Sequence, residues 1–303
     1  MIPVKGPRRS GRKLSATAPD EAESIDTGAH AMRDAECIAF LQWALPRLGR
    51  SWPGYRRVRR LVCKRLARRL QSLGLADLDA YRRHLSAGPE EWHHLDALCG
   101  IPISRFYRDH AVFDALERVV LPALADAAIA HSRTTLDCWS AGCASGEEPY
   151  TLAILWAVRL QPRFPQLGLH VVGSDLDERL LARARAGRYA ASSLKELPEE
   201  LRAAGFEAAD GERRVRDRFR HVELIRQDLR EAMPEGAFDL VLCRNAVLTY
   251  YAPPVQLALA RRIVDRLRPG GALVVGVHEA LPEALAGLAP WPQARGVHRR
   301  ALD

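Results

Sequence analysis

The sequence lacks the features of a membrane-spanning or metal-binding protein. No stretch approaches the roughly 18 consecutive apolar residues that a bilayer span requires, and no apolar segment follows the basic N-terminus to complete a secretory signal. The six cysteines contain no CxxC pair, and the ten histidines form no metal-ligand motif, so no metal site is expected. These absences predict a cytoplasmic protein without membrane insertion.

The composition also excludes several non-globular classes. Apolar residues make up 48% of the 303 positions and charged residues 27%, which are ordinary values for folded proteins. Wholesale disorder, collagen and coiled-coil arrays are therefore excluded. The length allows one large domain or two modest ones, each large enough to bury a core.

The net charge of +8 arises in one short segment. Residues 51–70, SWPGYRRVRRLVCKRLARRL, contain eight Lys and Arg and no acid, and the remaining 283 residues balance at 37 basic against 37 acidic. A uniformly basic, histone-like protein is excluded. Within this segment a basic amphipathic helix is predicted at 56–70, because its apolar residues recur every three or four positions: Val58, Leu61, Val62, Leu66 and Leu70.

The rhythm of apolar residues divides the chain into three parts. Residues 1–33 show no periodicity and are expected to form a disordered basic tail. Residues 34–110 show helical spacing throughout and predict an all-helical domain. Residues 111–303 predict an α/β domain with a mostly parallel sheet covered by helices, since helical segments alternate there with apolar runs at 135–141, 169–175, 221–228, 238–245 and 272–279.

The loops after the first two predicted strands indicate a nucleoside ligand. The first loop contains small residues, including Gly142 and Ala144, which allow a ligand to approach the backbone closely. The second strand ends at Asp175 and Asp177, and a carboxylate in this position commonly accepts hydrogen bonds from a ribose diol. No GK[ST] phosphate cradle is present, which disfavours an NTPase. S-adenosylmethionine (SAM), a nucleoside without a polyphosphate, fits these features.

Five sequence blocks, in order over residues 36–282, resemble the CheR-type chemotaxis receptor methyltransferases, a family of SAM-dependent protein-glutamate O-methyltransferases. The chain is identified as a divergent stand-alone member. The blocks are SRFYRD (104–109), WSAGCASGEEPYTLAIL (139–155), SDLDERLLARARAGRY (174–189), FDLVLCRN (238–245) and LRPGGALVVGVHEAL (267–281). The resemblance implies a small all-α domain followed by a Rossmann-like methyltransferase domain that binds SAM and releases S-adenosylhomocysteine (SAH).

The resemblance also implies a set of cofactor contacts. In matching positions, Ser104 and Arg108 would hold the carboxylate end of SAM, and an Arg fork suits a carboxylate because two parallel N–H groups meet two oxygens. Glu147 or Glu148 would serve the amino group or the sulfonium side. The remaining implied contacts are Gly142 and Ala144 in the small-residue loop, Asp175 with Asp177 at the ribose, Asp228 and Leu229 at the adenine, and Asn245 beside the methyl group.

Two catalytic positions follow from the same blocks. Arg244 would orient the acceptor together with the family's active-site tyrosine, which maps to Tyr250 or Tyr251 because the run after Asn245 is one residue longer than in the family. A glutamate acceptor, with a reference pKa of about 4.3, is ionised at neutral pH and needs no general base.

Two further departures from the family pattern concern binding. Pro102 stands where the family has an Asn that contacts SAM. The region 190–220 is polar and shows only one weak strand, so the family's small β-subdomain is expected to be reduced or absent.

The resemblance implies an acidic, Glu-rich helical protein, a chemoreceptor, as the partner that docks on the basic helix 56–70. Arginines of this helix that pair with acids of the same fold are the structural alternative. Other functional readings are a nucleic-acid methyltransferase, disfavoured by the absence of an N-P-P-[YF] motif, transfer to another protein or a small carboxylate, and a non-catalytic SAM-binding signalling protein. A monomer is expected.

Overall fold

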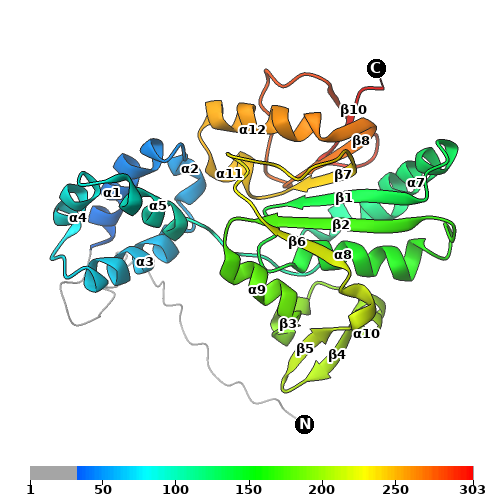
Figure 1. Ribbon diagram of the computed structural model, residues 1–303, viewed down its shortest axis with the longest axis horizontal. Coiled ribbons are helices and arrows are strands. Elements are labelled where there is room, and N and C mark those ends of the chain that lie inside the picture. Colours follow the sequence, from blue (N-terminus) through cyan, green and yellow to red (C-terminus); the bar gives the residue numbers. More distant parts are fainter. Residues whose placement is uncertain (1–32, 303) are drawn as a thin grey trace, which may run out of the picture.

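The computed structural model describes residues 33–302, so the predicted disordered tail lies, apart from Arg33, outside the described residues. The described chain begins with a helical region, as predicted (Figure 1). Its helices are α1 (Asp34–Arg47), α2 (Trp52–Tyr55), α3 (Arg59–Ser72), α4 (Leu78–Leu85) and α5 (Pro89–Leu98).

The helical region is built on its own apolar core. Phe40, Tyr55, Leu66, Tyr81 and Leu95 are all fully buried in it. The basic helix begins three residues later than predicted, because residues 56–58 form a turn after the separate short helix α2, which carries a proline in its first turn.

A disulfide joins α1 to α3 in this core. Cys37 and Cys63, 26 residues apart, form the bond, and both are buried. The other four cysteines are buried and unpaired. Disulfides are uncommon in the reducing cytoplasm, so the cytoplasmic location stays a prediction. In residues 33–302 no helix is both long and apolar enough to cross a membrane.

A seven-stranded sheet forms the second region, and its order is β6-β2-β1-β7-β8-β10-β9. The first five strands of that order are parallel neighbours and correspond to the five predicted runs. The strands β9 and β10, which were not predicted, extend the sheet in antiparallel fashion. The bounds are β1 (Thr135–Ala141), β2 (Gly168–Asp175), β6 (Val222–Arg226), β7 (Phe238–Cys243), β8 (Leu267–Val275), β9 (Leu288–Pro290) and β10 (Val297–Arg300).

Helices cover both faces of the sheet, because side chains alternate between the two faces. Cys138 and Leu240 pack with α7 and α8 on one face, whereas Trp139 and Val241 pack with α12 on the other. A π-helical turn, Leu116–Val120, joins α6 (His110–Ala115) to α7 (Leu121–Ala130), and another, Trp156–Leu160, continues α8 (Glu147–Leu155). The remaining helices are α9 (Glu178–Ala186), α10 (Glu199–Gly205), α11 (Val247–Tyr250) and α12 (Pro253–Asp265).

A small β-subdomain is present, so the alternative that it is absent is wrong, whereas its reduction relative to the family stays a prediction. A three-stranded antiparallel sheet, β3-β5-β4, lies beside α10 (Figure 1). Its strands, β3 (Arg188–Tyr189), β4 (Phe206–Ala209) and β5 (Glu212–Val215), are short, and only a few of their residues are fully buried. With few inward apolar residues, they lack the alternating pattern by which strands are predicted.

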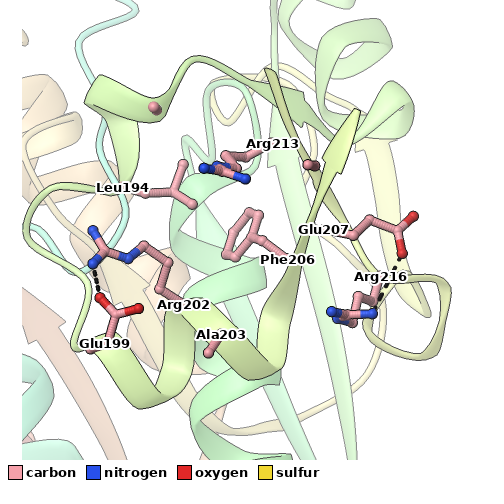
Figure 2. Close-up of a pocket in the computed structure, with 10 residues that line it drawn as sticks. Leu194, Glu199, Arg202, Ala203, Phe206, Glu207, Arg213 and Arg216 are labelled. Carbon is pink, nitrogen blue, oxygen red and sulfur yellow. Dashed lines mark ion pairs between the residues drawn. The ribbon is translucent and has the colours of Figure 1, made fainter. Parts of the chain in front are cut away.

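A cavity of about 520 Å³ lies between this small sheet and α10 (Figure 2). Leu194 and Phe206 form its apolar wall, and arginines stand around it. Arg202 pairs with Glu199, and Arg216 with Glu207. None of its lining residues belongs to the cleft described below.

The helical region meets the carboxyl ends of the parallel strands through α2 and α11. Backbone hydrogen bonds join Ser51 N to Tyr250 O at 2.9 Å and Ala252 N to Gly49 O at 2.9 Å. The rings of Tyr55 and Tyr250 pack with centroids 5.1 Å apart. This contact places the helical region over the edge of the sheet where ligands bind in open α/β folds.

Candidate cofactor and acceptor site

A cleft of about 1090 Å³ lies between the helical region and the sheet. The strand order reverses beside β1, whose neighbours β2 and β7 continue in opposite directions, and the loops after β1, β2, β6 and β7 line the cleft. All sequence-predicted site residues line it except Glu147: Ser104, Arg108, Gly142, Ala144, Glu148, Asp175, Asp177, Asp228, Leu229, Arg244, Asn245, Tyr250 and Tyr251.

The loop after β1 turns back through left-handed backbone. Gly142 has φ +80°, and a Cβ there would lie 3.1 Å from Cβ of Ala246, so only glycine fits without displacement. The loop is fixed to the end of β2, because Gly142 N donates to Ser174 O at 2.8 Å and Ala144 N donates to Asp175 Oδ2 at 2.9 Å. The small residues thus leave open space at the switch point of the sheet.

Asp175 and Asp177 have different environments. Asp175 accepts the backbone N–H groups of Ala144 and Asp177, each at 2.9 Å, and burial raises its pKa. Asp177 caps α9 by accepting from Arg179 N at 2.9 Å, and its hydrogen bond with the Arg179 side chain lowers its pKa. The Asp175 carboxylate is held in place and keeps free acceptor positions, while Asp177 serves the helix terminus.

The structure distinguishes Glu147 from Glu148. Glu147 is 2% exposed, accepts from Ser145 Oγ at 2.8 Å, and lies behind the cleft. Burial raises its pKa. Glu148 faces the cleft, accepting from Ser140 Oγ at 2.8 Å and from Arg244 Nη1 at 2.9 Å. Of the two glutamates left open by the sequence, Glu148 is the one at the ligand space.

Arg244 connects three segments that line the cleft. Its side chain is 3% exposed. Besides Glu148, its guanidinium donates from Nη2 to Arg108 O and to Asp109 Oδ2, each at 2.7 Å. The role predicted for Arg244, orienting an acceptor, stays a prediction. The structure adds a positioning role, because Arg244 fixes the backbone of Arg108.

Glu279 is a site residue to which the sequence analysis assigned no role, although it belongs to the block LRPGGALVVGVHEAL. Its Oε2 accepts from Asn245 N at 2.9 Å and from Gly276 N at 2.7 Å, and its Oε1 accepts from Thr249 Oγ1. Asn245 has φ +53°, a backbone conformation that side chains rarely adopt. Glu279 therefore holds the turn that carries Arg244 and Asn245.

Both candidate tyrosines line the cleft, in different surroundings. Burial raises the pKa of Tyr250, and Arg108 acts in the opposite direction from nearby. Tyr251 lies between two guanidinium groups, with Arg50 4.9 Å and Arg230 5.9 Å from its ring centroid. Tyr250 is thus the tyrosine on the Arg108 side of the cleft, and Tyr251 is the one on the Asp228 side.

The lining fits a nucleoside with an amino-acid tail. The fixed carboxylate of Asp175 lies where a ribose diol would bind. Arg108 also lines the cleft, and its guanidinium is suited to bind the carboxylate of an amino-acid tail. Of three large apolar side chains exposed in the described part of the chain, Ile103 (49%) and Leu176 (36%) line this cleft. Apolar surface left open beside charged groups suits a base or methylene chain.

The family model of the CheR methyltransferase SAM-binding domain matches residues 103–291. A chemotaxis protein methyltransferase of Listeria innocua is 34% identical over 186 residues, covering 61% of this chain and 68% of that protein. The chemotaxis protein methyltransferase of Salmonella typhimurium is 33% identical, covering 73% and 76%.

Two further likenesses are partial. A 104.1 kDa protein of Rhodobacter capsulatus is 34% identical over 224 residues, which are 73% of this chain but 23% of that protein. Among solved structures, SAM-bound CalS10, an amino pentose methyltransferase of Micromonospora echinaspora, is 24% identical over 51% of this chain and 48% of that chain, with a TM-score of 0.29. The fold of this chain is therefore described by its own strand order, β6-β2-β1-β7-β8-β10-β9, and not by this structural likeness.

The comparisons confirm the family predicted from the five blocks, SAM as the cofactor, and an α/β methyltransferase fold after a helical N-terminal region. The family model covers more than half of the chain, and two chemotaxis methyltransferases are matched over more than two thirds of their length. The chain therefore belongs to the CheR family of SAM-dependent chemotaxis methyltransferases.

Proposed function

We propose that the chain transfers the methyl group of SAM to glutamate side chains of an acidic, helical protein of the chemoreceptor type. Its relatives from Listeria and Salmonella are named chemotaxis protein methyltransferases, which supports this acceptor class. The proposal depends most on one observation in this chain, the unpaired positive charge of the basic segment 51–70, which includes most of α3.

Three of the eight cations in the basic segment have partners within the fold. Arg59 pairs with Asp34 at 2.8 Å, and Arg69 pairs with Glu91 at 2.6 Å. Arg65 donates to the carbonyl oxygens of Leu98 and Gly100. The structural alternative, internal pairing, thus accounts for only part of the charge. Five cations are exposed with no acidic partner in residues 33–302: Arg56, Arg57, Arg60, Lys64 and Arg68.

The helix α3 borders the cleft. The two carbonyl groups that Arg65 holds belong to Leu98 and Gly100, which line the cleft. A Glu-rich helix attracted by the exposed cations of α3 is therefore brought next to the methyl-transfer site. Such attraction accelerates encounter and weakens with salt.

Different residues of the cleft would bind different parts of SAM. Arg108 would hold the carboxylate end of SAM, Asp175 the ribose, and Asp228 with Leu229 the adenine. When bound, SAM supplies an electrophilic methyl group on a sulfonium. The protein's task is then to align an acceptor with that methyl group and to exclude water.

Acceptor orientation is assigned to Tyr250 and Arg244. Burial raises the pKa of Tyr250, so its hydroxyl keeps its proton at neutral pH and can donate a hydrogen bond to a carboxylate. A glutamate acceptor is already ionised at that pH. No residue is therefore assigned as a general base.

A methyl-ester assay tests the proposal. The protein is incubated with SAM tritiated at the methyl group and with the Glu-rich cytoplasmic helical region of a chemoreceptor or, in parallel, with RNA. Label in the protein that alkali releases as volatile methanol supports glutamate methylation. Alkali-stable label in RNA, or SAM binding without transfer to either acceptor, contradicts it.

A further inference from the structure

The loop after β6, residues 227–232, carries Asp228 and Leu229 and is fixed from the side of α12. Arg262 donates to the carbonyl oxygens of Leu229 and Arg230 at 3.0 and 2.8 Å. These bonds hold the loop backbone. Asp228 Oδ1 accepts from Arg230 N of the same loop at 2.9 Å, whereas the Arg230 side chain is oriented by groups outside the loop as well.

A chain of ion pairs connects Asp228 to the helical region. Arg230 donates to both carboxylate oxygens of Asp228, and its Nη2 also donates to Asp96 Oδ2 at 2.6 Å. The other oxygen of Asp96 accepts from Arg50 Nε at 2.6 Å. Asp96 lies on α5. The side chains of Arg50 and Asp96 are each 7% exposed, so these charges are held in the protein interior.

The ion pair with Arg230 keeps Asp228 negatively charged. Burial alone would raise the pKa of Asp228, but its hydrogen bonds with Arg230 outweigh burial, and the pKa lies below the usual value. Asp228 is therefore a carboxylate at neutral pH and acts only as a hydrogen-bond acceptor. An exocyclic amino group, which donates, is its natural partner.

We propose that Asp96 of the helical region is a positioning residue for the adenine of the cofactor. By holding Arg230, Asp96 fixes the carboxylate of Asp228 in the orientation that accepts a hydrogen bond from the adenine amino group. The inference rests on the adenine position assigned under the proposed function. It links cofactor recognition at the sheet to the docking of the helical region.

Binding of two ligands tests this role without any methyl transfer. Isothermal titration calorimetry measures the affinity of the full chain for SAH and for its 6-deamino analogue, in which hydrogen replaces the adenine amino group. A hydrogen bond to a charged acceptor makes the wild type prefer SAH by roughly tenfold to a hundredfold. In Asp96→Asn we expect that preference to fall to about threefold or less, because SAH binds more weakly while the affinity for the 6-deamino analogue stays the same.

Matched variants identify the cause of any change. Asp79→Asn, which removes an exposed ion pair with Arg82 in the same helical region, should keep the full preference. Asp228→Ala should lose it, and adding Asp96→Asn to Asp228→Ala should change it no further.

Three results would overturn the inference: equal weakening of both ligands in Asp96→Asn, an unchanged preference in that variant, or no preference in the wild type. A failure of the proposed acceptor chemistry would leave these binding ratios as they are, so the two proposals fail separately.

Discussion

Arg244, directly after β7, donates a hydrogen bond from Nη1 to Oε2 of Glu148, at the start of α8, over 2.9 Å. The same guanidinium holds Asp109 and the backbone of Arg108. One side chain thus joins the loop that precedes α6, the first turn of α8 and the end of β7. A residue with these contacts affects both the stability of the fold and the geometry of the cofactor cleft.

We predict that Arg244→Gln lowers both stability and SAM affinity. Two partly buried carboxylates, Glu148 and Asp109, lose their buried partner. Breaking a fully buried pair costs on the order of 3–5 kcal/mol, which is the upper bound here, and the backbone of Arg108 loses the hydrogen bond that holds it. SAH affinity should fall at least tenfold, as measured by calorimetry beside urea unfolding. Arg133→Gln, which breaks the buried pair with Asp239 away from the cleft, should lower stability and leave SAH affinity unchanged.

Unchanged SAH affinity in Arg244→Gln would contradict the positioning role. Normal methyl transfer in the same variant would also remove the orienting role predicted from the sequence.

Reversal of four exposed cations in the basic segment 51–70, two of them on α3 and two just before it, should abolish acceptor methylation and spare cofactor binding. The variant replaces Arg56, Arg57, Arg60 and Arg68 by Glu, which turns an attractive face into a repulsive one for an acidic helix. We expect transfer to the chemoreceptor fragment to fall at least a hundredfold at low salt, where screening is weak. Tritium transfer and SAH calorimetry measure the two properties separately.

The control carries the same charge change elsewhere. Exposed arginines that do not line the cleft are replaced by Glu: Arg118, Arg163, Arg261 and Arg295. This variant should methylate the acceptor at a near-normal rate. Equal losses in both variants would mean that net charge matters and that the basic segment 51–70 is not the docking surface.

The sequence predicted the parallel part of the sheet because most of its strands, such as β1, β7 and β8, are buried on both faces and read as continuous apolar runs. The antiparallel strands of the sheet escaped prediction. The strand β9 ends in Pro290, and β10 contains Arg299 and Arg300, so neither has an apolar run. The small sheet escaped for the same reason, since its strands bury only a few side chains such as Phe206 and Val215.

The cleft could be predicted from local blocks, whereas the contacts that hold it together could not. Loop residues such as Gly142 and Asp175 lie within continuous motifs. The pair Asp96 and Arg230 is separated by 134 residues, and no local pattern indicates that the two side chains meet. The exclusion of Glu147 from the cleft depended on the direction of one helical turn, which sequence spacing alone left open.

SAH binding should become pH-dependent when Arg230 is replaced. In the wild type, Asp228 has a lowered pKa because Arg230 outweighs the effect of burial, with Arg50 acting in the same direction. It therefore stays ionised down to and below its usual titration range. In Arg230→Gln burial dominates, the pKa rises, and Asp228 gains a proton as the pH falls from 7 towards 5.

We expect the affinity of Arg230→Gln for SAH to decrease over that interval while the affinity of the wild type changes little. Calorimetry at several pH values measures the difference. Asp175, whose pKa is raised by burial, is present in both proteins, so the difference between their pH profiles reports on Asp228. Parallel pH profiles would refute the assignment.

The disulfide between Cys37 and Cys63 should stabilise the helical region. Closing a loop of this length contributes about 3 kcal/mol in the chain-entropy model, and the bond fixes α3 against α1. Urea unfolding with reductant should therefore show lower stability than unfolding without it. The double variant Cys37→Ser/Cys63→Ser should be insensitive to reductant, and a wild type that is equally insensitive would show that the bond does not form.

Gly54 permits the contact between the helical region and the sheet, and Gly54→Ala should disrupt it. A Cβ at this position would lie 2.0 Å from the carbonyl oxygen of Thr249, which is backbone of the turn that leads to Tyr250. Relief requires α2 and α11 to separate, which breaks the hydrogen bond between Ser51 and Tyr250. We expect a loss of about 2–3 kcal/mol in stability, as for overpacked interiors, together with weaker SAH binding.

Gly88→Ala is the matched control, since nothing lies within 4 Å of a Cβ there and its extended backbone accepts any residue. That variant should unfold at the same urea concentration as the wild type or slightly above it. If Gly54→Ala keeps full SAH affinity and stability, then the contact between α2 and α11 does not hold the helical region over the cleft, and the route from Asp96 to the adenine must be maintained by the ion pairs alone.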